Sequence, residues 1–221
     1  MSIELGKFNQ LEVVKEVDFG VYLDGGEEGE ILLPTRYVPE DCKIGDFLNV
    51  FLYLDMDERL IATTLTPLVQ VGQFDCLEVS WVNQYGAFLN WGLMKDLFVP
   101  FREQKMKMQV GRKYVVHAHV DEESYRIVAS AKVERYLSKE KPEYAPGAEV
   151  NILIWQKTDL GFKAIIDDMY SGLLYENEIF CPLETGMEMK AFVKQVREDG
   201  KVDLILQKPG FEKIDDFSKT L

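Results

Sequence analysis

The sequence predicts an all-β protein, a tandem array of three small five-stranded barrels. Gly6, Gly20 and Gly45 recur 66 residues later as Gly72, Gly86 and Gly111, and a further 75 residues on as Gly147, Gly161 and Gly186. Each copy contains about five short runs rich in β-branched and aromatic residues, separated by turn residues. A sheet this small is left with exposed edges unless it closes, so closed barrels are the expected form.

The individual strands are predicted from text that aligns around these glycines. The runs of the first copy read FNQLEVVKEV, FGVYLD, EILLP, FLNVFLYLD and RLIATT. The second copy offers YGAFLNWG, LFVP and VGRKYVVHAHVDEESYRIVASA, and the third offers LGFKAIID, GLLYENEI and TGMEMKAFVKQVREDGKVDLIL. We therefore expect barrels over residues 1–66, 70–137 and 146–208.

The connecting segments differ in length and composition. TPLVQVG is short, which favours close packing of the first two barrels, whereas VERYLSKEKPEYAPG begins like a helical turn and holds two prolines, as a semi-rigid spacer would. In the tail 209–221, apolar residues recur at the spacing of one helix face. We expect this tail to begin a helix that leads toward a further domain.

Composition limits the class of protein. Apolar residues make up 47% of the chain, which predicts packed cores, and no apolar run approaches the roughly 18 residues of a membrane span. Because the N-terminus lacks the pattern of an export signal, we expect a soluble cytoplasmic protein that does not bind membranes. Three cysteines without a CxxC pair favour neither a disulfide framework nor a structural metal.

The repeated text resembles a known domain. The aromatic-Gly-x-aromatic pattern, the glycine-led fourth strand and the Asp-to-Arg turn resemble the S1 domain, an oligonucleotide-binding (OB-fold) barrel. With DFGVYLDG, ILLP and the GFEKID tail, the three copies resemble the conserved virulence factor B family of bacterial RNA-binding regulators. This resemblance implies single-stranded RNA as the partner, a role in post-transcriptional or virulence-type gene regulation, and a winged-helix domain after the third barrel.

Aromatic pairs flank the repeated strand glycine in the first two copies. If Gly20 and Gly86 mark β-bulges, Phe19 with Tyr22, and Tyr85 with Phe88, share a face on which unpaired bases stack. The alternatives are that these rings belong to the core, or that one ring of each pair is buried and the other exposed. The third copy has Leu160 and Lys163 at these positions and lacks the pair of rings.

Charge favours the middle barrel as the main RNA site. Residues 1–70 carry 5 basic against 14 acidic side chains, residues 71–141 carry 11 against 9, and residues 142–221 carry 9 against 15. The basic side chains of the middle copy cluster in FREQKMKMQVGRK, and the S1 pattern places another basic residue at Arg126. The candidate RNA-binding residues are therefore Tyr85, Phe88, Arg102, Lys105, Lys107, Arg112, Lys113, Arg126, Phe19, Tyr22, Arg59, Lys163 and Lys201.

Other chemistry has weaker support. His117 and His119 share a strand face with Asp121, but two histidines alone more often form a polar barrel face than a metal site. No nucleophile with a base and no phosphate-cradling loop is present, so we expect no enzyme, metal or cofactor. Two hypotheses remain, a single-stranded RNA-binding regulator and an acidic scaffold whose basic middle barrel docks a protein partner.

Overall fold

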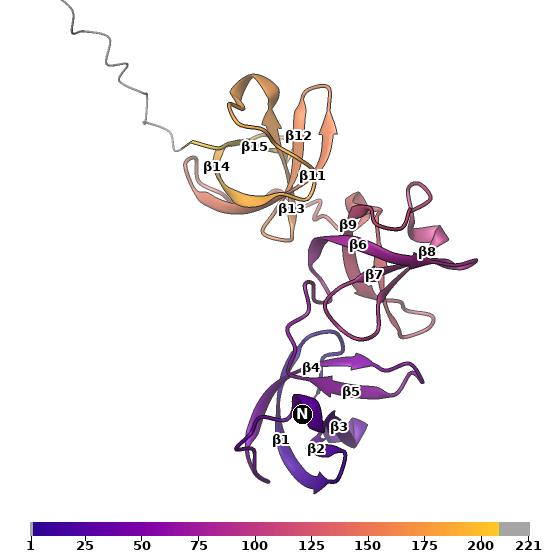
Figure 1. The fold of residues 1–221 in the computed structure, drawn as a ribbon. Helices are drawn as coiled ribbons and strands as arrows, with labels where there is room; N and C mark the ends of the chain where they lie inside the picture. Colours follow the sequence, from indigo (N-terminus) through magenta and orange to yellow (C-terminus); the bar gives the residue numbers. More distant parts are fainter. Residues whose placement is uncertain (1, 208–221) are drawn as a thin grey trace, which may run out of the picture. The chain divides into compact units, whose positions relative to one another are not determined.

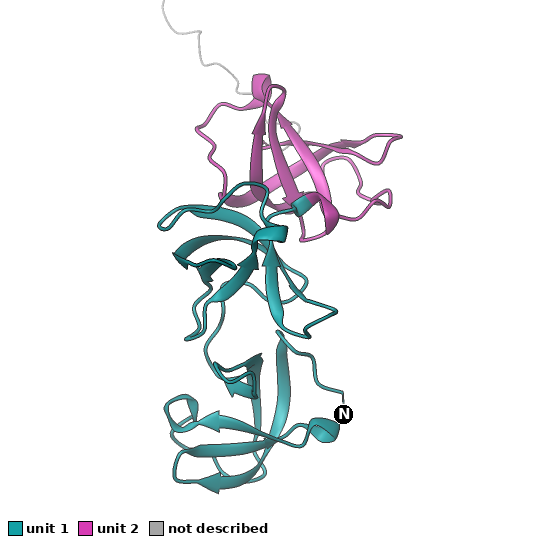
Figure 2. Ribbon diagram, turned by 90° about the vertical axis from the view of Figure 1, so that its right-hand side faces the viewer, with its two compact units in different colours: residues 1–133 teal, residues 134–221 magenta. Residues whose placement is uncertain are grey.

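A computed structural model describes residues 2–207, in which fifteen strands form three closed barrels of five strands each (Figure 1). The predicted all-β class and the tandem array of five-stranded barrels are confirmed. The described residues divide after Val133 into two compact units, shown in teal and magenta in Figure 2. No helix of residues 2–207 has the length and apolar character needed to cross a membrane.

The first barrel closes in the strand order β1-β2-β3-β5-β4, with β3 and β5 parallel and the other pairs antiparallel. Its strands are β1 (Phe8–Val17), β2 (Gly20–Asp24), β3 (Glu30–Pro34), β4 (Phe47–Leu54) and β5 (Leu60–Thr63). Alternate side chains turn inward, so that Leu11, Leu23, Ile31, Leu33 and Leu52 fill the core. The five runs predicted from the first copy are all strands.

The second barrel belongs to the same compact unit and repeats this order. Its strands are β6 (Phe74–Val82), β7 (Gly86–Asn90), β8 (Leu97–Pro100), β9 (Lys113–Val120) and β10 (Ile127–Ser130). Leu77, Val79, Leu89, Leu97 and Val116 are buried in its core. This core is continuous with Phe51 and Tyr53 of the first barrel, because the short linker keeps the two barrels in contact.

The third barrel lies in the second unit. Its strands are β11 (Glu149–Thr158), β12 (Gly161–Ile166), β13 (Tyr170–Tyr175), β14 (Glu188–Val196) and β15 (Val202–Ile205). Ile152, Ile154, Leu174, Val193 and Leu204 are among its core residues.

Short 3₁₀ helices are the only helical elements within residues 2–207: η1 (Gly26–Glu28), η2 (Thr35–Tyr37), η3 (Phe101–Glu103), η4 (Val133–Arg135) and η5 (Glu176–Glu178). η2, η3 and η5 each follow the third strand of their barrel. η4 supplies the helical turn predicted at the start of the second linker. The predicted helical tail lies outside the described residues, and the predicted barrel limits stay predictions.

The prediction of a bulge at the repeated strand glycine is wrong. Gly20 pairs in register with both Val17 and Pro34, and the extra residue lies instead in β1, at Val14. The glycine is required because a Cβ on Gly20 would lie 2.2 Å from the carbonyl oxygen of Leu33. A Cβ on Gly86 or Gly161 would lie equally close to a carbonyl oxygen of the next strand, at 2.2 and 2.0 Å. Their barrels have the extra residue in β6 and β11.

Candidate nucleic-acid interface

Each barrel presents one row of residues that pair across all five strands, which we call the outer row. In the second barrel this row comprises Trp81, Phe88, Phe98, Val128 and His119. Because side chains alternate between the two faces of a strand, these residues face outward while Val79, Leu89 and Leu97 fill the core. The bulge in β6 brings Trp81 opposite Phe88.

The aromatic rings of this row form a continuous apolar surface. Trp81 and Phe88 are parallel, with centroids 3.7 Å apart and planes within 1°, and Phe88 and Phe98 lie 4.8 Å apart with planes tilted by 33°. The indole Nε1 of Trp81 donates a hydrogen bond to Asp96 Oδ2 at 3.1 Å, which fixes the orientation of the ring. Trp81 remains 46% exposed, so its ring is accessible to a ligand.

Tyr85 lies in the turn between β6 and β7 and is 65% exposed. Tyr85 lines the same cavity as Phe88, but the ring on which Phe88 stacks is Trp81. The predicted pairing of Tyr85 with Phe88 as a two-ring platform stays a prediction.

This surface forms one wall of a cavity of about 600 Å³. Two cations line it, Arg126 at the end of the β9–β10 turn and Lys95 in the β7–β8 loop. Lys95 Nζ donates a hydrogen bond to the carbonyl oxygen of Asp55 at 2.8 Å, and partial burial lowers the pKa of Lys95 below its usual range. The cavity therefore combines aromatic rings, on which bases can stack, with two cations, which can pair with phosphates.

The first barrel supplies the opposite wall. Tyr53, Leu54, Met56 and Glu58, from β4 and the β4–β5 turn, line the cavity. The barrels are joined by an edge-to-face contact between Phe51 and Trp91, with centroids 5.7 Å apart, and by the ion pair of Glu58 and Arg126. The site is thus composite: the stacked rings of Trp81, Phe88 and Phe98 belong to the second barrel, and Tyr53 belongs to the first.

The predicted basic segment of the second barrel does not line this cavity. Arg102 pairs with Asp121 at 2.8 Å and Glu123 at 3.5 Å, while Lys105, Lys107, Arg112 and Lys113 are exposed away from the cavity lining. The segment is anchored in the barrel by two buried side chains: Met108 packs into the core, and Glu103 accepts a hydrogen bond from Ser130 at 2.6 Å.

The outer row of the first barrel comprises Lys15, Tyr22, Leu32, Ile61 and Tyr53. Phe19 and Tyr22 do lie together, edge to face with centroids 6.3 Å apart, and Lys15 Nζ lies 5.4 Å from the centre of the Tyr22 ring. Tyr53 is covered by the second barrel. Arg59 pairs with Asp55 and Asp57 and does not line the cavity.

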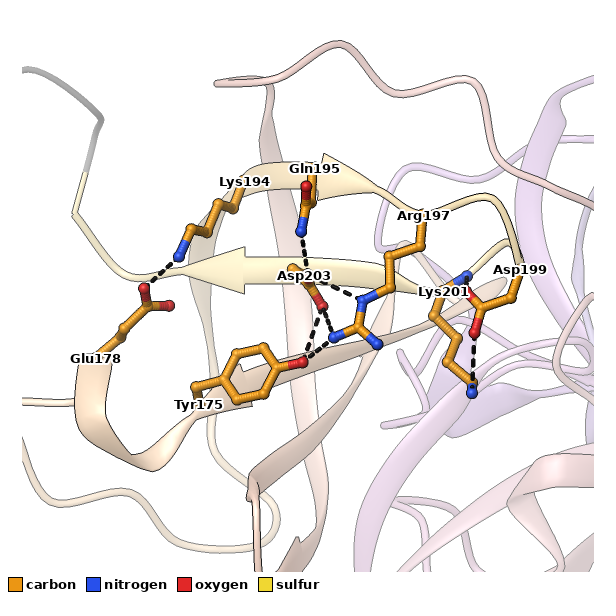
Figure 3. Close-up of polar contacts among 8 residues, drawn as sticks. All are labelled: Tyr175, Glu178, Lys194, Gln195, Arg197, Asp199, Lys201 and Asp203. Atoms are coloured by element: carbon orange, nitrogen blue, oxygen red, sulfur yellow. Dashed lines mark hydrogen bonds and ion pairs between the residues drawn. The ribbon is translucent and has the colours of Figure 1, made fainter.

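The outer row of the third barrel is polar at four of its five positions and comprises Gln156, Lys163, Leu173, Asp203 and Gln195. Asp203 is only 3% exposed, and Figure 3 shows three side chains converging on it. Its Oδ2 accepts from Gln195 Nε2 at 2.7 Å and from Arg197 Nε at 3.0 Å, and Arg197 also contacts the hydroxyl of Tyr175. Lys201 pairs with Asp199, and Lys163 Nζ lies 5.1 Å from the Trp155 ring. The outer row of the third barrel therefore has no aromatic rings on which a base could stack.

The two histidines lie side by side on β9, with ring centroids 6.1 Å apart. His117 is buried against Phe74 at 4.6 Å, and His119 ends the outer row. Burial, followed by the charge of His119, lowers the pKa of His117 from its ordinary 6.5 to about 4. Within residues 2–207, no three His, Cys, Asp or Glu side chains are grouped as a metal site requires.

Sequence reasoning missed Trp81, Phe98 and Lys95. The signal for the two rings was present, because the offset that relates Gly20 to Gly86 also relates Lys15 to Trp81 and Leu32 to Phe98. Reading all three copies by position would have shown that only the middle copy is aromatic at these places. Lys95 has no such signal, since it lies in a loop and its role depends on a contact with the first barrel.

Comparison with known proteins matches residues 5–65, which hold the first barrel, to the S1 domain family. Over 213 residues the chain is 28% identical to the uncharacterized protein YitL of Bacillus subtilis (strain 168), covering 93% of this chain and 71% of that protein. A crystal structure from Streptococcus pneumoniae TIGR4, described as a multidomain protein with nucleic acid binding domains, has 21% sequence identity and a TM-score of 0.51. That match covers 96% of this chain and 77% of the other, and it supports the fold.

Proposed function

We propose that the protein binds single-stranded RNA, with the aromatic outer row of the second barrel as the base-stacking surface, and that this binding serves post-transcriptional regulation. The observation that carries the proposal is the meeting of Trp81, Phe88 and Phe98 with Arg126 in one cavity. Aromatic rings stack on unpaired bases of any sequence, and a guanidinium pairs with phosphate.

The position of the site within the barrel supports this proposal. OB-fold barrels bind oligonucleotides on the face of strands 2 and 3 and with the loops after strands 1 and 4. Phe88 and Phe98 lie on the second and third strands, Tyr85 lies in the loop after the first, and Arg126 ends the loop after the fourth. A single strand fits this site better than a duplex, because paired bases do not expose their faces.

The proposal is tested by replacing Trp81 and Tyr85 with alanine together. Both side chains are exposed, so their loss leaves the barrel core intact. We expect the affinity for a labelled uridine-rich 12-mer at low salt to fall at least about tenfold, since each base stack contributes about 1–3 kcal/mol. Fluorescence anisotropy measures the change.

Phe180→Ala is the matched control, because this ring is highly exposed on the third barrel and should not affect RNA affinity. Equal affinities of the double variant and the unaltered protein would refute the RNA-binding surface. That result would favour the alternative, an acidic scaffold that docks a protein partner.

A further inference from the structure

One residue of the first barrel holds the arginine that the proposed site needs. Glu58 Oε2 lies 2.5 Å from Arg126 Nη2, across the cavity lined by both residues and by the aromatic row. Both side chains are partly exposed, at 40% and 53%, so a ligand that enters the cavity reaches this ion pair.

The β4–β5 turn fixes Glu58 in place. Asp55 Oδ1 accepts hydrogen bonds from the backbone nitrogens of Asp57 and Arg59, both at 2.9 Å, and the backbone nitrogen of Glu58 donates to the Asp55 carbonyl oxygen at 3.1 Å. Glu58 has a φ of 63°, a left-handed conformation that is unfavourable for residues with a Cβ. At the same place in the turn the third barrel has Gly200, with a φ of 80°. The turn itself therefore does not require glutamate.

We propose that Glu58 competes with RNA phosphate for Arg126. Glu58 pairs with Arg126 in the free protein, and a backbone phosphate displaces it when a base stacks on Trp81 or Phe98. This inference rests on the proposed function and adds the regulation of its affinity. Carboxylate and phosphate engage the same fork of guanidinium donors, and two anions close to each other repel. Phosphate therefore binds Arg126 most favourably when Glu58 has moved away.

The expected size of the effect follows from the exposure of the pair. Exposed ion pairs are weak, so Glu58 lowers RNA affinity without blocking binding, and Glu58→Gln should raise the affinity about two- to fivefold. Because salt screens exposed charges, this gain should shrink as the ionic strength rises.

The test compares Glu58→Gln with Asp57→Asn in the full chain, by anisotropy of a labelled uridine-rich 12-mer. Asp57→Asn is the matched control because this substitution removes one negative charge from the same turn. Asp57 pairs with Arg59, 2.9 Å away, and neither residue lines the cavity. We expect Glu58→Gln to bind more tightly than Asp57→Asn, and we expect no further gain from Glu58→Gln when Arg126 is already glutamine.

Two results would overturn the inference: equal affinities of the Glu58→Gln and Asp57→Asn variants, or a gain that persists without Arg126. The double variant Trp81→Ala, Tyr85→Ala distinguishes failure of this inference from failure of the proposed RNA binding. If the double variant loses affinity while Glu58→Gln behaves like the control, RNA binding stands and the competition is wrong. A protein that binds no RNA overturns both.

Discussion

The second and third barrels share strand order and register, yet their outer rows differ at every position. Where the second barrel carries Trp81, Phe88 and Phe98, the third carries Gln156, Lys163 and Leu173. The fourth position is Val128 in one barrel and the buried carboxylate of Asp203 in the other. The core residues that specify the barrel are separate from the outer residues, which can differ from one barrel to the next.

The two barrels also bury different polar groups. The second buries an imidazole, His117, whose pKa is lowered so that it is neutral near pH 7. The third buries the carboxylate of Asp203, which pairs with the partly exposed Arg197 and accepts a hydrogen bond from the exposed Gln195. Each barrel should therefore fail under a different perturbation, and only one of them should lose RNA binding when its outer row is changed.

The largest expected effect is on the stability of the third barrel. Arg197→Met leaves the buried carboxylate of Asp203 without its cation, which should lower the free energy of unfolding of this barrel. Hydrogen-exchange mass spectrometry should show lost amide protection in β14 and β15, with RNA affinity unchanged.

Arg59→Met provides the comparison, because Arg59 is an exposed residue of the corresponding turn in the first barrel. Arg59→Met should lower the free energy of unfolding less than Arg197→Met does, because exposed ion pairs contribute little to stability. Equal destabilisation by the two substitutions would show that the Asp203 cluster is no stronger than a surface ion pair.

A second prediction concerns the pH dependence of the second barrel. The unfolded chain takes up a proton on His117 near pH 6.5, whereas the folded barrel does so only near pH 4, so stability falls as the pH falls through this window. Over the whole window the loss is roughly 3 kcal/mol, at about 1.4 kcal/mol per pKa unit. Amide exchange measured from pH 7 to pH 5 should show β6–β10 losing protection before β11–β15.

His117→Gln should remove this part of the pH dependence. The variant has no group that titrates in this range at position 117, so its stability should change less between pH 7 and pH 5 than that of the unaltered protein. Identical pH profiles would exclude His117 as the cause.

A third prediction concerns a substitution that places in the second barrel the residue found at the same outer-row position of the third barrel. Phe88→Lys removes the central ring of the outer row and adds a positive charge at the position of Lys163. We expect RNA affinity to fall about fivefold to a hundredfold, because a lost base stack outweighs one added cation. Lys163→Ala should change the affinity less than twofold. Tighter binding by Phe88→Lys would mean that charge and not stacking holds the RNA.

The smallest expected effect is on salt dependence. Arg126→Gln should reduce the slope of log affinity against log salt by about 0.7, the contribution of one phosphate contact on a single strand. Lys201→Gln, at the related turn of the third barrel, should leave the slope unchanged, because Lys201 pairs with Asp199 on a face without stacked rings. Anisotropy titrations between 50 and 300 mM salt, about the range in which such contacts titrate, measure both.

The barrels themselves were predictable because their determinants repeat. The offsets between glycines located three copies, and the β-rich runs of the first copy match its five strands. The role of Gly20 was not predictable, since a glycine in a strand marks either a bulge or a close approach of backbone. The close approach to Leu33 depends on the neighbouring strand, and the true bulge at Val14 has no glycine to mark it.

The candidate site was predicted in part. Tyr85, Phe88 and Arg126 line the cavity, whereas the five cations of the basic segment do not. Local charge density pointed to that segment, but the packing of Met108 and Glu103 determines where it lies. The opposite wall was beyond sequence reasoning, because Glu58 and Arg126 are 68 residues apart and meet through contact between two barrels.

Ultraviolet crosslinking of a uridine-rich single strand to the full chain, followed by mass spectrometry of the linked peptides, tests the central claim most directly. We predict crosslinks on the peptides that hold Trp81, Tyr85, Phe88 and Phe98, and their loss when excess unlabelled strand competes. Crosslinks confined to the first or third barrel, or absent from these peptides while RNA is bound, would contradict the assignment of base stacking to the second barrel.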